Sequence, residues 1–89
     1  MPLTDELRLV IWDTDPARIA RLDRTLHLAL AELGLKGIVT CNSEPPSLMR
    51  AGLYNRVPTL EIEGNYWTCR DGEPDLTACV RLLRKITER

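Results

Sequence analysis

The residues of this sequence that could do chemistry are the stretch Trp12-Asp13-Thr14-Asp15 and three cysteines. An apolar run ends at Trp12 and a helical pattern opens at Pro16, so the stretch lies in a corner between a predicted strand and a predicted helix. The first turn of a helix offers unpaired N–H groups and the positive end of the helix dipole, which both favour an anion. A cysteine in such a corner is held as a reactive thiolate, whereas this corner holds aspartates.

Two interpretations of the corner compete. In the structural interpretation Asp15 caps the helix, which contributes about 1 kcal/mol, and Trp12 closes the top of the core. In the functional interpretation the stretch from Trp12 to Asp15 is a recognition surface, because a half-buried tryptophan is a good contact anchor. In both, Asp15 supplies the cap, so we expect that replacing Asp13 by alanine leaves stability nearly unchanged.

An Asp-x-Asp pattern after a strand is also similar to the acidic corner of haloacid-dehalogenase phosphatases and of response-regulator receivers. Those sites need further acidic and lysine side chains at later strand ends to hold magnesium and a phosphoryl group. After Asp23 this sequence has aspartates only beside its last predicted helix. Magnesium chemistry at the corner is therefore not expected.

The three cysteines differ in their predicted surroundings. Cys79 lies on the apolar stripe of the last helix and is expected to be a small core residue. Cys69 shares a strand face with Trp67, which favours burial, but a thiol role for it stays open. Cys41 ends the second strand on the same side of the sheet as the corner, so it is the other candidate thiol. With His27 alone in mid-helix, these cysteines match no metal-ligand spacing.

The charges are evenly distributed. Arg18, Arg21 and Arg24 follow one line of the first helix, but Asp23 interrupts it, so a solvated face is expected. The chain has 12 basic and 13 acidic residues, which offers no electrostatic case for nucleic acid or an anionic membrane as partner. The apolar runs are much shorter than the roughly 20 residues of a membrane span, and the N-terminal stretch does not resemble a secretory signal. We expect a cytoplasmic protein with reduced cysteines and without cofactor or metal.

The elements that position these residues are expected to form a single domain over residues 1–89, with its core at about 7–86. Hydrophobic periodicity predicts, in chain order, a strand at 7–12, a helix from Pro16 to Gly34, a strand at Gly37–Cys41, a short helix between Ser43 and Gly52, a hairpin at 59–69 and a helix from Pro74 to Ile86. The helical connection makes the first two strands parallel.

This order of elements, with Arg56-Val57-Pro58-Thr59 before the hairpin, resembles the thioredoxin and glutaredoxin superfamily from Leu7 to about Ile86. The segment Val57-Pro58-Thr59 is similar to the one in which that family places a cis-proline facing its active site. The resemblance implies a thioredoxin-like three-layer α/β domain of βαβ-α-ββ-α order with a mixed four-stranded sheet. It also implies a central first strand, the first and third helices on one face, and the short helix on the other.

Redox-active members of the superfamily carry a cysteine, commonly Cys-x-x-Cys, in the corner that here reads Asp13 to Ile19 without any cysteine. The resemblance therefore implies a redox-inert binding module whose partner is another protein. Its contact surface comprises the residues Trp12, Asp13, Thr14, Asp15, Arg56, Val57, Pro58 and Thr59. The competing hypothesis is a glutaredoxin-type thiol-disulfide oxidoreductase or thiol carrier that uses Cys41 or Cys69. The oligomeric state stays open.

Overall fold

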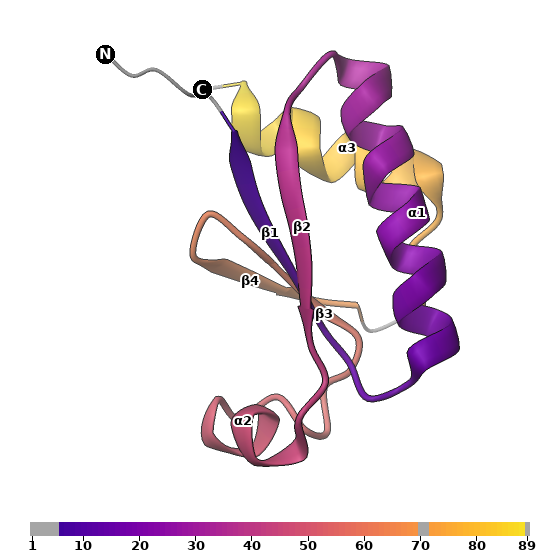
Figure 1. Ribbon diagram of the computed structural model, residues 1–89. Helices are drawn as coiled ribbons and strands as arrows, with labels where there is room; N and C mark the ends of the chain where they lie inside the picture. Colours follow the sequence, from indigo (N-terminus) through magenta and orange to yellow (C-terminus); the bar gives the residue numbers. More distant parts are fainter. Residues whose placement is uncertain (1–5, 70–71, 89) are drawn as a thin grey trace.

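The computed structural model describes residues 6–69 and 72–88, which form a mixed four-stranded sheet and three helices (Figure 1). The elements are β1 (Leu7–Trp12), α1 (Pro16–Leu33), β2 (Gly37–Asn42), α2 (Pro45–Arg50), β3 (Thr59–Ile62), β4 (Asn65–Thr68) and α3 (Leu76–Thr87). The strand order is β2-β1-β3-β4, with β1 parallel to β2 and antiparallel to β3. The α/β class, the order of elements and the central first strand are confirmed.

The two long helices begin at aspartate caps. The Asp15 carboxylate accepts hydrogen bonds from the N–H groups of Ala17 and Arg18 at 3.0 and 3.4 Å. At the end of α1, Gly34 adopts a left-handed conformation with φ of 67°, which glycine tolerates without a steric cost. Asp75 caps α3. Within the described ranges, no helix combines the length and the apolar character that crossing a membrane requires.

Several boundaries differ from the sequence prediction by one or two residues. The last helix begins at Leu76 rather than at Pro74, because the Asp75 side chain accepts the N–H of Ala78 and so becomes the cap. The short helix is preceded by Glu44, whose side chain makes no capping hydrogen bond, rather than by Ser43. Strand β2 extends by one residue to Asn42, opposite Trp12. In each case the element itself was predicted.

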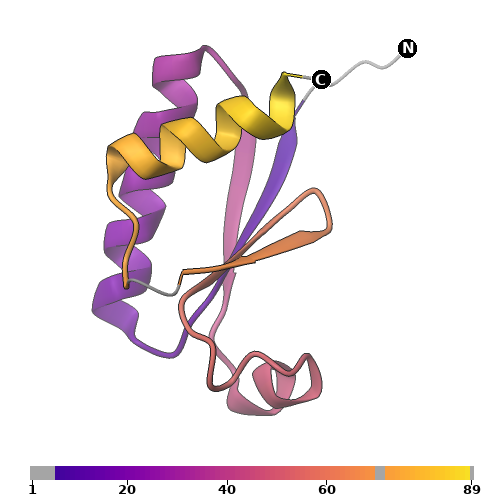
Figure 2. The same ribbon diagram turned by 180° about the vertical axis from the view of Figure 1, so that it is seen from behind.

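One face of the sheet packs against α1 and α3, as expected (Figures 1 and 2). Alternate residues of β1 and β3 point toward these helices, as the two-residue period of a strand requires. The buried core consists of Leu9, Ile11, Leu22, Leu26, Ala29, Leu30, Leu60, Ile62, Cys79, Val80 and Leu83. This core fixes the carboxyl end of β1 at the start of α1, where the candidate site lies.

The helix α2 does not form the third layer that was expected. It lies beyond the end of the sheet, at the end where β1 and β2 finish (Figures 1 and 2). At about 1.5 Å per residue, its six residues span about 9 Å, so this helix is also too short to cover a face of the four-stranded sheet. The sheet face away from α1 and α3 therefore carries exposed apolar side chains, including Tyr66 and Ile38, which are 52% and 48% exposed.

Candidate functional site

Asp13 occupies the corner between β1 and α1 as a buried group and not as a surface group. Its side chain is completely buried. Its Oδ1 accepts hydrogen bonds from the N–H groups of Thr14 and Asp15 at 2.7 and 3.2 Å, and from Nη2 of Arg18 at 2.6 Å. Its Oδ2 accepts a further hydrogen bond from Nε of Arg18. The carboxylate is thus held on both oxygens and has no free face for a partner or a metal ion.

The surroundings of Asp13 keep it ionised. Burial acts to raise the pKa of Asp13, but hydrogen bonds from Arg18 and from the N–H groups of Asp15 and Thr14 outweigh burial and hold the pKa below its ordinary value. The hydrogen bond to Asp13 is the main reason why the pKa of Arg18 is raised. Asp15 caps α1 as predicted, but Asp13 also accepts the N–H groups of Thr14 and Asp15, so we expect that Asp13 contributes to stability as well.

Arg18 is the site residue that sequence analysis missed. It was assigned to a solvated basic line, yet its side chain is only 26% exposed and pairs with Asp13. A signal was present, because a cation in the first turn of a helix opposes the dipole and needs a compensating carboxylate. Asp13, five residues earlier, is the compensating group.

Trp12 lies on the sheet face away from the core and does not close the top of the core. Its Nε1–H donates a hydrogen bond of 2.8 Å to the Glu61 carboxylate on β3. Its ring centroid lies 6.3 Å from that of Tyr66 on β4, with the two planes tilted by 57°. Trp12 is partly exposed, so it remains available as a contact residue.

The loop before β3 lies beside the corner, because Thr59 pairs with Trp12 in the sheet. The Val57–Pro58 peptide is cis, as predicted. Pro58 and Thr59 are buried, whereas Arg56 is exposed and Val57 is partly exposed. Of the eight residues assigned to the contact surface, the accessible ones are Trp12, Thr14, Asp15, Arg56 and Val57. The other three residues, Asp13, Pro58 and Thr59, are buried beneath this surface.

An open groove of about 390 Å³ runs along this loop. It is lined by Asn55, Arg56, Val57, Thr68 and Cys69. Within residues 6–69 and 72–88, the N–H and C=O groups of Val57 form no hydrogen bond. The groove therefore offers an unpaired backbone donor and acceptor beside an exposed guanidinium group.

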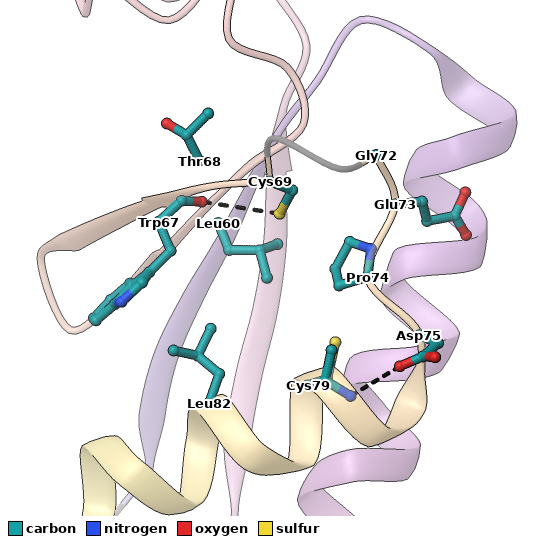
Figure 3. Close-up of a pocket in the computed structure, with 11 residues that line it drawn as sticks. Leu60, Trp67, Thr68, Cys69, Gly72, Glu73, Pro74, Asp75, Cys79 and Leu82 are labelled. Atoms are coloured by element: carbon teal, nitrogen blue, oxygen red, sulfur yellow. Dashed lines mark hydrogen bonds between the residues drawn. The ribbon is translucent and has the colours of Figure 1, made fainter.

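Cys69 and Cys79 line a neighbouring cavity of about 510 Å³ between β4 and α3, which shares Thr68 and Cys69 with the groove (Figure 3). Burial raises the pKa of both thiols, and it raises that of Cys79 to about 11. The charge of Asp13 raises the pKa of Cys69 further. Both groups are neutral thiols at pH 7, and a neutral thiol is a poor nucleophile.

Cys41 is exposed and lies far from the other candidate thiol. It belongs to β2, and Cys69 follows β4, so the two lie at opposite edges of the sheet. Cys41 lines a cavity of about 410 Å³ together with Pro16 and Ile19 from the start of α1. The structure thus brings neither candidate thiol into a pair with the other.

Metal-ligating side chains do not cluster in the part of the chain that the structure describes: no three histidine, cysteine, aspartate or glutamate side chains come together there as a candidate metal site. Comparison of the chain with models of known protein families, with curated proteins and with solved structures finds no significant match. The site is therefore interpreted from its own geometry.

Proposed function

We propose that this chain is a redox-inert, thioredoxin-like domain that binds another protein through the corner after β1 and the loop before β3. The strand order, the packing of α1 and α3 on one face and the cis peptide at Val57–Pro58 are features that the resemblance implies. The observation that carries the proposal is the ion pair of the buried Asp13 with Arg18, in the corner where the resemblance implies a nucleophilic cysteine.

The corner favours an anion, and its two carboxylates are both engaged in hydrogen bonds. Both oxygens of Asp13 are occupied by hydrogen bonds, and the Asp15 carboxylate caps α1. The nucleophile of a disulfide exchange is a thiolate, and its stabilisation at a helix N-terminus is what activates it. This corner has the stabilising N–H groups and the arginine without the thiol, so we expect binding rather than catalysis.

The groove beside the corner fits an extended segment of a partner protein. The N–H and C=O groups of Val57 can pair with the backbone of such a segment, as in recognition by strand addition. Trp12 and Tyr66 supply aromatic contact area nearby, and aromatic side chains are frequent anchors in interfaces. Among the described residues that line the groove, Arg56 is the charged one, so we expect an acidic side chain in the bound segment.

The exposure of Cys41 is the observation that favours the competing function, a thiol carrier. A carrier that forms mixed disulfides needs an accessible thiol, and Cys41 satisfies that condition. Cys69 is less suited to this role, because burial and the charge of Asp13 both raise its pKa and so disfavour the reactive thiolate. A thiol function would therefore have to rest on Cys41 alone, at the opposite sheet edge from the groove.

Selection of peptides from a random display library against the immobilised protein, followed by calorimetry, tests the binding function. We expect the selected peptides to bind several-fold more weakly to Arg56→Glu, because the variant reverses the charge beside the groove. The matched control is Arg84→Glu on α3, which changes an exposed arginine on a different element and should leave Kd unchanged. Equal affinity for the wild type and for Arg56→Glu would contradict the proposed surface.

A further inference from the structure

Strand β2 is an edge of the sheet that lacks the usual protection against pairing with another strand. Within the described ranges its only neighbour is β1, and its sequence Gly37-Ile38-Val39-Thr40-Cys41-Asn42 holds neither charge nor proline. Natural edge strands are commonly protected by lysines, prolines or bulges. Ile38 is 48% exposed on this strand. The edge therefore presents a six-residue template for a further strand.

Two hydrogen bonds show which backbone groups of β2 point outward. The carbonyl groups of Lys36 and Asn42 accept the N–H groups of Leu7 and Asp13 at 2.9 and 3.3 Å. Successive residues of a strand present their N–H and C=O groups to opposite sides, so the even-numbered residues from 36 to 42 pair with β1. The odd-numbered residues 37, 39 and 41 consequently present N–H and C=O groups to the outside.

We propose that a second copy of this chain pairs at this edge, with the two β2 strands antiparallel around a two-fold axis through Thr40. In this register Val39 lies opposite Cys41 of the partner subunit, and their outward N–H and C=O groups form reciprocal hydrogen bonds. Thr40 lies opposite Thr40 of the partner subunit, and threonine pairs across antiparallel strands are favourable. The two sheets become one sheet of eight strands.

The charges that flank β2 select this register. It places Lys36 of each copy opposite Glu44 of the partner subunit. The backbone is extended at both positions, as pairing requires. The Lys36 carbonyl accepts the N–H of Leu7 on β1, and Glu44 has φ of −83° and ψ of 118°. Both residues are exposed, and neither takes part in an ion pair within the described chain.

Neighbouring registers lose this charge complementarity. In any other register the odd-numbered residues of the two strands must still face each other, because they carry the outward N–H and C=O groups. The residue opposite Lys36 therefore changes in steps of two, from Glu44 to Asn42 or Pro46 of the partner subunit. Neither of those residues carries a charge. Two strands and their flanking side chains cover less than the roughly 1,200 Å² of a standard interface, so the dimer is weak and depends on concentration.

Sedimentation velocity over a range of protein concentrations tests the proposal. The wild type should show a monomer–dimer equilibrium that weakens as salt rises. Thr40→Lys, which places two like charges at the axis, should raise Kd at least tenfold. Lys36→Glu and Glu44→Lys should each weaken the dimer several-fold, and the variant with both substitutions should recover wild-type affinity. Lys85→Glu on α3 is the matched control and should leave Kd unchanged.

Three results would overturn the proposal. The first is a wild type that sediments as a monomer at every concentration. The second is a dimer that Thr40→Lys leaves intact, or that Thr68→Lys at the opposite edge abolishes instead. The third is a double charge swap that binds more weakly than either single substitution. Circular dichroism confirms in each case that the variant is folded, and the charge swaps test the register even if Thr40→Lys does not fold.

Discussion

The N-termini of α1 and α3 are built alike but differ in the ionisable groups beside them. Both helices begin at an aspartate cap, Asp15 for α1 and Asp75 for α3. Beside α1 the pKa of Asp13 is lowered, whereas beside α3 burial raises the pKa of Cys79 to about 11. The N-terminus of α1 stabilises an anion and holds carboxylates, whereas the surroundings of the thiols near α3 disfavour the thiolate form. Redox chemistry would require both properties at one site, and this chain separates them.

The separation has a direct physical cause in each place. At α1 the positive charge of Arg18 and two backbone N–H groups converge on one carboxylate. At α3 Cys79 lies inside the first helical turns and faces the core, and the negative charge of Asp75 also raises its pKa. A thiolate there loses hydration without gaining a cationic partner.

The largest expected effect comes from removing the anion at α1. Asp13→Ala leaves two N–H groups and the Arg18 guanidinium without their acceptor, so we expect the free energy of unfolding to fall by about 2–3 kcal/mol. The matched substitution at α3, Asp75→Ala, removes one capping bond and should cost about 1 kcal/mol. Urea unfolding measures both. Equal losses would mean that the Asp13–Arg18 pair adds nothing beyond a cap.

The next effect concerns the thiols at α3 and appears at alkaline pH. The thiol of Cys79 ionises at its ordinary pKa of 9.0 when unfolded and at about 11 when folded. Between these values the unfolded state binds fewer protons, so stability is full below pH 9 and is lost as pH rises toward 11. The loss is on the order of 2 kcal/mol. Urea unfolding at several pH values should show a shallower decline for Cys79→Ala, and parallel curves would contradict the assignment.

Placing a thiol at each N-terminus compares the two positions directly. Asp15→Cys puts a thiol at the cap of α1, close to Arg18, and Asp75→Cys puts one at the cap of α3. We expect the thiol at position 15 to have a pKa about one unit below that of a free cysteine, and below that of the thiol at position 75. Alkylation rates against pH in a Cys41→Ser background measure both. A higher pKa at position 15 would refute the anion-stabilising role of the α1 terminus.

The smallest effect is expected at the ion pair that links the two regions. Nε of Arg21 on α1 lies 3.0 and 3.1 Å from the two carboxylate oxygens of Glu73, just before α3. The arginine side chain is 53% exposed, and exposed ion pairs add little to stability because water and salt screen them. Arg21→Ala should therefore unfold at the same urea concentration as the wild type, within error. A clear destabilisation would show that the two regions are coupled through this pair.

Much of the fold could be predicted from local patterns. The leucine spacing, the cap at Asp15 and the left-handed Gly34 define α1, and the turn at Glu63 and Gly64 defines the hairpin. The resemblance implied that the short helix covers the second sheet face, but Val10 on that face is only partly buried. That difference arises because α2 lies beyond the end of the sheet, and the sequence pattern does not reveal where a short helix packs.

The candidate site was predictable in position but not in orientation. The corner and the loop were found from residue types, and the structure brings them together through the Trp12–Thr59 pair. The outward direction of Trp12 depends on the strand register, and the burial of Asp13 depends on Arg18, which contacts it from the following helix. Periodicity within one element carries no information on such contacts between elements.

A disulfide-reduction assay with the purified protein tests most directly whether the chain is redox-inert. We expect the wild type to reduce an insulin disulfide, or a mixed disulfide with glutathione, no faster than a free thiol at the same concentration. Cys41→Ser and Cys69→Ser variants should give the same rate as the wild type. Turnover well above the free-thiol rate that disappears in Cys41→Ser or in Cys69→Ser would contradict the redox-inert interpretation and establish a thiol enzyme in its place.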